Sequence, residues 1–463
     1  MDSRVKAHFD SIKGKRIAFI GIGRSNLPLT LMYKQKGAIV YACDRKTPEQ
    51  LGDAAAEMQK AGVILKCGED YLDGLQVDII FRAPGMYYYN EKLQAYRKAG
   101  VTVTSEMEVF FDLCPCKIYA ITGTDGKTTT TTITTLCLEK AGKTVHKGGN
   151  IGIPLLPIIE QIKPTDAAVV ELSSFQLISM RKSPDTAAVT NIYPDHLNVH
   201  KDMDEYIGAK KNIILHQNAF SRTVLNMDNE QTNALSDIVR GDLYKFSRNS
   251  VPERGSYLDT DGYLCFTDGK TTEKLLHKDD IRIPGMHNVE NYLTAISILH
   301  GDVDNSVFAA VAKEFCGVEH RIEFVRELDG VKYYNDSIAT SPASVIAGLN
   351  SFDRRLIVIA GGSDKMLDYN TMSHEICEHV KLLILLGETA PKIEKAVRSA
   401  DNYDENEIKI LHADCLENAV NTARENANIG DVVTLSPASA SFDLYKDFEE
   451  RGRHFKSIVN NLE

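Results

Sequence analysis

The sequence predicts a mainly parallel α/β protein with three domains, and three observations support this prediction. The chain has 463 residues, more than one hydrophobic core normally serves, so two to four domains are expected. Apolar runs such as 16–20, 167–170 and 356–360 recur along the chain, and continuous runs of this kind are typical of strands buried on both faces. Most of these runs end at glycine or polar residues, as expected where parallel strands lead into loops at one edge of a sheet.

The first domain is predicted to be Rossmann-like. A strand over 16–20 enters the turn Gly21-Ile22-Gly23, and a second strand ends at Asp44. Strand, glycine turn, helix, strand and acidic residue is the order of a dinucleotide-binding unit. The third glycine of that fingerprint is replaced by Asn26, so a nicotinamide cofactor and a dehydrogenase activity are disfavoured.

The second domain opens with a candidate phosphate-binding loop. An apolar strand over 117–121 is followed by Gly123-Thr124-Asp125-Gly126-Lys127-Thr128. Backbone N–H groups, a helix N-terminus and a lysine can cradle phosphates there, while a threonine hydroxyl reaches Mg²⁺. The first glycine of the usual pattern is replaced by Ile121, so only G-x-x-G-K-T remains. The threonine run 128–132 predicts a first helical turn whose hydroxyls cap free N–H groups.

Two further strands of this domain bring polar residues toward the same edge. One run ends at Glu171, and the next ends in Tyr193-Pro194-Asp195-His196. Carboxyl ends of parallel strands share an edge, so Thr128, Glu171 and His196 are expected close together, with Thr128 and Glu171 as oxygen ligands of Mg²⁺. Around 243–283, short polar strands with Asp-Gly turns predict a small antiparallel edge.

The third domain repeats the alternation and is also predicted to be Rossmann-like. Its expected strands are 331–334, 356–360, 382–386 and 432–435. The resulting domains are residues 1–106, a central nucleotide-binding domain over 107–316, and 317–463.

Composition excludes some classes of function. The chain is 43% hydrophobic and 25% charged, as in ordinary soluble proteins. Its formal net charge of −11 argues against nucleic acid as a partner, because phosphate backbones require a basic surface. Small anionic ligands need only a local basic pocket and stay possible.

Cysteine content and hydropathy indicate a cytoplasmic protein. The nine cysteines are scattered, and the only close pair, in Cys114-Pro115-Cys116, lacks the further ligands that a zinc site needs. Free thiols in a reducing compartment are therefore expected. No apolar signal core follows Met1, and no apolar run approaches ~18 residues, so no membrane segment is expected.

Ordered motifs along the chain resemble those of one enzyme family. They are Gly123–Thr129, Gly149–Gly152, Glu171–Leu177, Asn191–Leu197, Gly285–Asn291, Gly317–Arg321 and Asn335–Ser337. The chain resembles the Mur ligases, ATP-dependent enzymes that add amino acids during peptidoglycan synthesis for the cell wall. The string at Glu171 and the string Ser436–Asp443 are most similar to the member that adds D-glutamate.

The resemblance implies a uridine nucleotide domain, an ATP domain and an amino-acid domain, in a protein expected to be a monomer. It implies that ATP phosphorylates the L-alanyl carboxylate of UDP-N-acetylmuramoyl-L-alanine. The amine of D-glutamate then attacks the acyl phosphate, and a tetrahedral intermediate collapses to the amide, ADP and phosphate. Phosphorylation is needed because a carboxylate is a poor electrophile at neutral pH. The general base that deprotonates the amine is not identified.

Family roles are carried over to the matching positions of the ATP and metal site. Lys127 is expected to hold the β- and γ-phosphates, within a loop that also comprises Gly123, Thr124, Asp125, Gly126, Thr128 and Thr129. The resemblance implies two Mg²⁺ ions, one on Thr128 and Glu171 and a second on His196 and Lys210, with Lys210 carbamylated. The pattern alone would have made Lys210 and Lys211 solvated helix lysines. Asn288 and Asn291 are expected at adenine, and Arg321 and Asp336 at phosphate and ribose on closure.

The remaining roles concern the two other substrates. Ser25, Asp44 and Gly85 match positions that hold the uridine diphosphate, and Asn150 a position at the muramoyl-alanine part. Thr340, Lys365, Ser441 and Phe448 match positions around the D-glutamate carboxylates, where a fixed ammonium selects an anion. Arg24 and Arg45 replace other residues of the family and would suit a diphosphate, or would simply be surface arginines. Ile338 stands where many relatives have a lysine, so that cation must come from elsewhere or be dispensable.

Alternative interpretations stay open at this point. A sibling ligase could add a different amino acid, although the Asp-Asn-Pro-Arg motif of the diamino acid enzyme is absent. Folate polyglutamate synthases share the ATP domain, but their first domain differs. A catalytically silent nucleotide-binding protein is disfavoured because every metal and phosphate position is filled.

Overall fold

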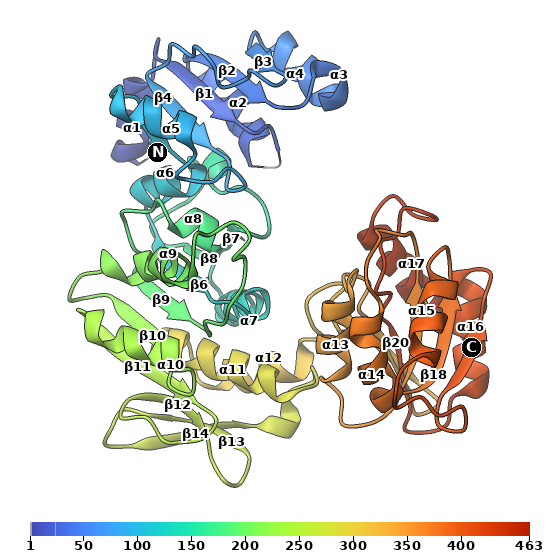
Figure 1. Ribbon diagram of the computed structural model, residues 1–463. Helices are drawn as coiled ribbons and strands as arrows, with labels where there is room; N and C mark the ends of the chain where they lie inside the picture. Colours follow the sequence, from blue (N-terminus) through green and yellow to red (C-terminus); the bar gives the residue numbers. More distant parts are fainter. Residues whose placement is uncertain (1, 24) are drawn as a thin grey trace. The chain divides into compact units, whose positions relative to one another are not determined.

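The computed structural model describes residues 2–23 and 25–463, which form two compact units (Figure 1). The first unit contains the residues up to Lys278 and Glu290–Val311, and the second contains Asp279–Val289 and Ala312–Glu463. Two sheets lie in the first unit and one in the second. The mixed, mainly parallel α/β architecture with three sheets confirms the predicted fold class. Arg24 lies outside the described residues.

The first sheet has five parallel strands in the order β3-β2-β1-β4-β5. Its strands are β1 (Arg16–Ile20), β2 (Ile39–Asp44), β3 (Ile64–Cys67), β4 (Ile79–Arg82) and β5 (Thr102–Thr104). The helices of this region are α1 (Ser3–Ser11), α2 (Asn26–Gln35), α3 (Pro48–Leu51), α4 (Asp53–Lys60), α5 (Glu91–Lys98) and α6 (Glu106–Leu113). The apolar residues of β1 are fully buried, and Phe19 stacks on Phe81 with ring centroids 4.7 Å apart. This is the expected Rossmann-like core.

The incomplete glycine fingerprint has a structural explanation. Gly21 has φ 79°, and a Cβ there would lie 3.0 Å from Cβ of Ala83. Asn26, at the third glycine position, is buried and donates Nδ2 to the carbonyls of Ile20 (2.9 Å) and Gly21 (3.1 Å). Asn26 therefore stabilises the turn by hydrogen bonds from its side chain, where a glycine would allow close packing of the helix against the strand.

The central sheet has nine strands in the order β14-β13-β12-β11-β10-β9-β6-β8-β7. Its strands are β6 (Lys117–Thr122), β7 (Val145–Gly149), β8 (Ala167–Glu171), β9 (Thr186–Val189), β10 (Arg222–Asn226), β11 (Asp242–Ser247), β12 (Gly255–Leu258), β13 (Tyr263–Thr267) and β14 (Thr272–His277). The associated α-helices are α7 (Lys127–Lys140), α8 (Ser174–Leu177), α9 (Met203–Leu215), α10 (Glu230–Asn233), α11 (Met286–Leu299) and α12 (Ser306–Glu314). Short 3₁₀ helices cover Leu156–Ile158, Ala234–Ile238 and Lys278–Asp280.

The antiparallel edge is smaller than the sequence predicted. Strands β12, β13 and β14 pair antiparallel, but β11 pairs parallel with β12. Gly255, at φ 137°, pairs with Lys245 in this parallel ladder and lies against its backbone. A Cβ at Gly255 would lie 1.8 Å from that carbonyl oxygen, so only glycine fits.

The capping role predicted for the threonine run is wrong. Gly126 is the N-cap of α7 and makes no side-chain capping bond, and the hydroxyl of Thr128 in the first turn donates to Glu171 instead. The hydroxyl of Thr132 donates to the carbonyl of Thr128, and Thr134 and Thr135 donate to the carbonyls of Thr130 and Thr131 in the same way. Inside a helix a threonine hydroxyl can satisfy itself on the carbonyl four residues earlier, so the run continues the helix.

The third sheet has six strands in the order β15-β16-β20-β17-β18-β19, and only β15 runs antiparallel to its neighbour. Its strands are β15 (Glu323–Leu328), β16 (Val331–Asn335), β17 (Leu356–Gly361), β18 (Val380–Leu386), β19 (Lys409–His412) and β20 (Val432–Leu435). Its helices are α13 (Pro342–Leu349), α14 (Asn370–His379), α15 (Ala390–Arg398), α16 (Leu416–Asn426) and α17 (Phe448–Asn460). Strand β17 is buried along its whole length, as the continuous apolar run predicted. The exact domain boundaries near 106 and 317 stay predictions.

Candidate active site

The phosphate loop connects the end of β6 to the start of α7, as predicted. Gly126 has φ 77° and directly precedes Lys127, the first residue of α7. Nζ of Lys127 donates to the carbonyl of Thr124 at 2.6 Å, so the lysine side chain folds back over its own loop. The first turn of α7 begins at this loop, which is the arrangement that binds anions in other helices.

The residues that follow β9 hold the loop in shape. Oδ1 of Asn191 accepts hydrogen bonds from the backbone N–H groups of Thr124 (3.2 Å) and Asp125 (2.8 Å). The hydroxyl of Thr190 donates to the carbonyl of Asp125 at 2.6 Å. The sequence did not predict either hydrogen bond, although Asn191 begins the motif Asn191–Leu197.

Gly126 also leaves space for an asparagine from α11. A Cβ at Gly126 would lie 2.4 Å from Oδ1 of Asn291, an atom that accepts the hydroxyl of Thr130 at 3.1 Å. Asn291 thus lies beside the phosphate loop. Asn288 donates Nδ2 to the carbonyl of Pro284 at 2.6 Å and belongs to the second unit. An adenine role for either residue stays a prediction.

The carboxylate of Glu171 lies where β8 ends, in contact with the loop. Glu171 is 1% exposed and accepts the hydroxyl of Thr128 on Oε2 at 2.7 Å. Oε1 accepts Nδ2 of Asn150 at 2.8 Å. A buried carboxylate beside a threonine hydroxyl supplies oxygen donors of the kind that Mg²⁺ prefers, so these two residues fit the predicted ion. Asn150, expected at the muramoyl-alanine part, is positioned here by Glu171.

Lys210 is buried and lies under the loop. It is 1% exposed, and Nζ donates to the carbonyl of Gly123 at 2.6 Å and lies 4.6 Å from the ring centroid of Tyr206. Burial, with the nearby charge of Lys127, lowers the pKa of Lys210 to about 7. The interpretation of this residue as a solvated helix lysine is therefore wrong. A buried amine that is readily neutral can react with CO₂, so Lys210 fits carbamylation.

The His196 side chain is half exposed, in the loop that follows β9. Its backbone has φ 54°, its Nε2 lies 3.4 Å from Oδ2 of Asp195, and its ring centroid lies 5.0 Å from that of Phe175 in α8. The charge of Lys210 interacts with the carboxylates of Asp195, Asp125 and Glu171. The two loops that end β8 and β9 and the phosphate loop therefore meet around Lys210. Whether His196 binds a metal ion stays a prediction.

A second histidine in the same loop, His200, is buried. His200 stacks parallel on Phe175 with ring centroids 5.1 Å apart, and it hydrogen-bonds Ser174 (2.9 Å) and Glu205 (3.0 Å). With both ring nitrogens engaged, His200 orders the loop that carries His196. Nothing in its spacing distinguished it from a surface residue.

The residues predicted for uridine diphosphate lie around the glycine turn of the first sheet. Asp44 accepts the backbone N–H of Ile22 on Oδ2 at 2.6 Å, and Ser25 is the N-cap of α2 without a side-chain capping bond. Gly85 is exposed, after β4. Arg45 pairs with Glu69 at 3.2 Å, with both side chains at least 75% exposed, which favours a surface arginine over a diphosphate ligand.

The second unit contains the residues predicted to bind the amino acid, and also Arg321 and Asp336, which were predicted at phosphate and ribose. Asp336 is buried and accepts Ser436 Oγ at 3.1 Å and Ile322 N at 3.2 Å. Burial raises the pKa of Asp336 to about 7, against the charge of the exposed Arg321. A carboxyl group that is easily protonated could donate as well as accept a hydrogen bond.

A buried arginine organises the loops around the predicted amino-acid residues. Arg451 donates Nε to Ser337 Oγ (3.1 Å), Nη1 to the carbonyl of Ala440 (3.2 Å) and Nη2 to the carbonyl of Ser439 (3.1 Å). Ser337 in turn donates to the carbonyl of Phe448 at 2.7 Å. The sequence did not predict a role for Arg451, because this residue lies outside the family motifs.

The other residues predicted to bind the amino acid differ in exposure. Ser441 is buried beside Ala440, whereas Lys365 is exposed with Nζ 5.5 Å from the ring centroid of Phe442. Thr340 and Ile338 are partly buried, and the backbone N–H of Thr340 donates to the carbonyl of Ile338 at 2.8 Å. Lys365 is therefore a cation beside Phe442, the residue that follows Ser441, and its role with D-glutamate stays a prediction.

Comparison with known proteins decides the family. The Mur ligase middle domain matches residues 121–299, and the Mur ligase glutamate ligase domain matches residues 320–439. The chain is 49% identical to UDP-N-acetylmuramoylalanine–D-glutamate ligase of Acetivibrio thermocellus over 100% of both chains. It belongs to the Mur ligase family.

A further relative agrees with this assignment. UDP-N-acetylmuramoylalanine–D-glutamate ligase of Clostridium kluyveri is 46% identical over 99% of this chain and 100% of its own length. As a Mur ligase, the protein is an ATP-dependent ligase that forms an amide bond.

Solved structures confirm the three-domain Mur ligase fold. UDP-N-acetylmuramate–alanine ligase of Thermotoga maritima is similar over 96% of this chain and 99% of its own, with a TM-score of 0.57 at 18% identity. A UDP-N-acetylmuramoyl-L-alanyl-D-glutamate–2,6-diaminopimelate ligase is similar over 98% of this chain and 94% of its own, with a TM-score of 0.59 at 16% identity. Among the described residues of this Mur ligase, no helix is long and apolar enough to span a membrane.

Proposed function

We propose that this Mur ligase joins D-glutamate to UDP-N-acetylmuramoyl-L-alanine, with ATP, in the synthesis of peptidoglycan precursors. The observation that carries the proposal is the 49% identity over the whole chain to a ligase of that name. The meeting of the phosphate loop, Glu171 and Lys210 in one buried cluster supports it further, since that cluster combines a candidate phosphate cradle with candidate metal ligands.

The chain's own residues account for the first step. Oxygen of the L-alanyl carboxylate bonds to the γ-phosphorus, the bond to the bridging oxygen breaks, and ADP leaves. Nζ of Lys127 offsets charge on the transferring group, and the loop N–H groups position it. Thr128 and Glu171 would hold one Mg²⁺, and His196 with Lys210 a second. Bound there, magnesium would neutralise the phosphate charge.

Lys210 is the residue that would be modified. CO₂ adds to a neutral amine, forming an N–C bond and releasing a proton, and the product is an anionic carbamate. The pKa of about 7, caused mainly by burial, keeps a large neutral fraction at physiological pH. Carbamylation therefore converts a buried cation next to the loop into an oxygen ligand.

The second step joins the amino acid. The amine nitrogen of D-glutamate, after losing a proton, attacks the acyl carbon, and phosphate leaves from the tetrahedral intermediate. We place the D-glutamate carboxylates at Lys365, Thr340, Ser441 and Phe448, and the uridine diphosphate at Ser25, Asp44 and Gly85. A lysine opposite a carboxylate and a buried hydroxyl supply the charge and the hydrogen bonds that select this substrate.

The proposal is tested by ATP-dependent phosphate release with UDP-N-acetylmuramoyl-L-alanine and each amino acid in turn. We expect release with D-glutamate and none with L-glutamate, L-alanine or a diamino acid. Release with another amino acid instead would assign the chain to a sibling activity. ATP binding without release for any amino acid would identify a silent nucleotide-binding protein.

A further inference from the structure

The segment between α6 and β6 contains two thiols in contact. Cys114 is the C-cap residue of α6, and Cys116 directly precedes β6. Their Sγ atoms lie 3.6 Å apart, and Sγ of Cys114 lies 3.7 Å from the carbonyl oxygen of Cys116. Each residue is 6% exposed. The Cys114 thiol thus contacts both the thiol and the carbonyl oxygen of Cys116.

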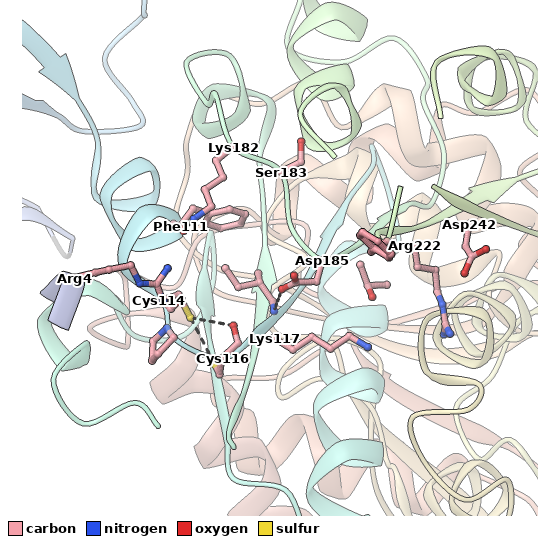
Figure 2. Close-up of a pocket in the computed structure, with 14 residues that line it drawn as sticks. Arg4, Phe111, Cys114, Cys116, Lys117, Lys182, Ser183, Asp185, Arg222 and Asp242 are labelled. Atoms are coloured by element: carbon pink, nitrogen blue, oxygen red, sulfur yellow. Dashed lines mark hydrogen bonds between the residues drawn. The ribbon is translucent and has the colours of Figure 1, made fainter. Parts of the chain in front are cut away.

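These two cysteines line a cavity of about 570 Å³ (Figure 2). Its walls include Lys117, Thr186, Arg222 and Asp242, the residues that begin β6, β9, β10 and β11. The cavity therefore lies at the amino ends of these parallel strands, whereas the phosphate loop follows the carboxyl end of β6. It is distinct from the candidate active site and large enough for a small organic molecule.

The two thiols are not equivalent. The thiol of Cys116 hydrogen-bonds Sγ of Cys114 and lowers the pKa of Cys114, and the nearby ammonium of Lys182 acts in the same direction. The same contact, with burial, raises the pKa of Cys116. By contrast, burial alone raises the pKa of Cys137 to about 12. Cys114 is thus the member of the pair suited to be a thiolate nucleophile.

We propose that Cys114 and Cys116 form a reversible disulfide by exchange with a small-molecule disulfide that enters this cavity. The Cys114 thiolate attacks one sulfur of the reagent, and the first thiolate leaves and takes up a proton. Cys116 then loses its proton and attacks the sulfur of Cys114, which expels the second thiolate. One reagent disulfide is reduced to two thiols, and the two protein thiols are oxidised to one disulfide.

The bridge has a structural consequence for the first unit. It would tie the end of α6 to the start of β6, which is the connection between the first and second sheets. A ring closed by only three residues restricts disulfide geometry, and a restrained disulfide is more readily reduced than a relaxed one. The pair is therefore suited to respond to the thiol–disulfide balance of its surroundings.

The test is equilibration of the full-length protein in glutathione buffers of increasing oxidised fraction, followed by acid quenching and peptide mass analysis. We expect the 114–116 peptide to lose two hydrogen atoms without gaining glutathione. Cys116→Ser should trap a glutathione adduct on Cys114, whereas Cys114→Ser should leave Cys116 unmodified. The more exposed Cys316 and Cys415 provide internal controls for adduct formation.

Two outcomes would overturn the proposal. One is that Cys114 and Cys116 stay reduced at ratios that modify Cys316 or Cys415. The other is that a glutathione adduct persists on Cys114 of the parent protein, which would show that Cys116 does not resolve it. Circular dichroism of both serine variants checks that they fold. None of these measurements depends on ligase activity.

Discussion

Arg82 donates a hydrogen bond from Nη2 to the backbone carbonyl of Phe175 at 2.9 Å, although the two residues are 93 positions apart. Arg82 ends β4 and is 2% exposed, and its Nη1 donates to the carbonyl of Met86 at 2.8 Å. Phe175 lies in α8, directly after the segment that carries Glu171. A single buried guanidinium thus connects the loop predicted for uridine diphosphate with the loop predicted for magnesium.

Replacing this guanidinium should destabilise the first unit. Arg82→Met leaves the carbonyls of Phe175 and Met86 and the hydroxyl of Ser179 without their donor, so we expect a loss of about 2–4 kcal/mol in the free energy of unfolding. Chemical denaturation measures it. The control is Arg45→Met, which removes an exposed ion pair and should cost less than ~0.5 kcal/mol. Equal effects of the two substitutions would contradict the structural role of Arg82.

Removal of the loop lysine should impair catalysis without impairing folding. Lys127→Ala removes the cation that we propose to stabilise charge on the transferring phosphoryl group, so turnover should fall at least ~10²-fold, equivalent to ~3 kcal/mol. Phosphate release under saturating ATP measures the change. Exposed Lys143, just beyond α7, gives the control Lys143→Ala, which should stay near the parent rate. Near-parent turnover of a folded Lys127→Ala protein would show that the loop is not catalytic.

Dependence on CO₂ tests the proposed carbamate. Only the neutral amine of Lys210 reacts with CO₂, and its pKa of about 7 means that this form predominates above neutral pH and is lost as pH falls below 7. We expect CO₂ depletion to lower the parent activity, bicarbonate to restore it, and the bicarbonate requirement to increase at lower pH. Mass analysis under native conditions should detect the added carboxyl group.

The neighbouring lysine provides a matched control for that site. Lys210→Ala should reduce turnover at least ~10²-fold because the proposed metal ligand is lost, whereas Lys211→Ala, on a partly exposed position of the same helix, should not. Indifference of the parent protein to CO₂ would leave the carbamate unsupported even if Lys210→Ala were inactive.

Glu106 should make the stability of the first unit depend on pH. Burial raises its pKa from 4.5 to about 7, although Oε1 accepts the N–H groups of Leu155 and Leu156 at 2.9 Å each. Between these values the folded protein binds more protons than the unfolded chain, so this contribution to stability falls as pH rises and is constant above about 7.

Glu106→Gln keeps an oxygen that can accept the N–H groups of Leu155 and Leu156, but it removes the negative charge of the carboxylate. The melting temperature of this variant should therefore exceed that of the parent by a margin that increases from pH 5 to about pH 7 and is constant from there to pH 8, as measured by calorimetry. Glu57→Gln, at an exposed position of α4, should show no such trend. A constant difference between Glu106→Gln and the parent across the range would refute the buried-charge account.

Much of the candidate site could be predicted from local strings. Gly126 has a positive φ before a helix, Lys127 and Thr128 begin that helix, and Glu171 ends β8. Short-range patterns therefore place these residues at one edge of the sheet. The family resemblance added Lys210, which no pattern of hydrophobicity distinguished from Lys211. Only the packing of α9 under the loop shows why these neighbours differ, because it excludes water from one amine and not from the other.

By itself, the sequence determined the α/β class, the succession of strands and the phosphate loop, because these depend on periodicity and on residues close together in the chain. Tertiary structure decided the parallel pairing of β11 with β12, the burial of Lys210, and the contacts of Arg82, Asn191 and Arg451. Those features arise where distant segments meet and desolvate each other. A polar side chain acquires its partners, and its pKa, only once the fold has removed the surrounding water.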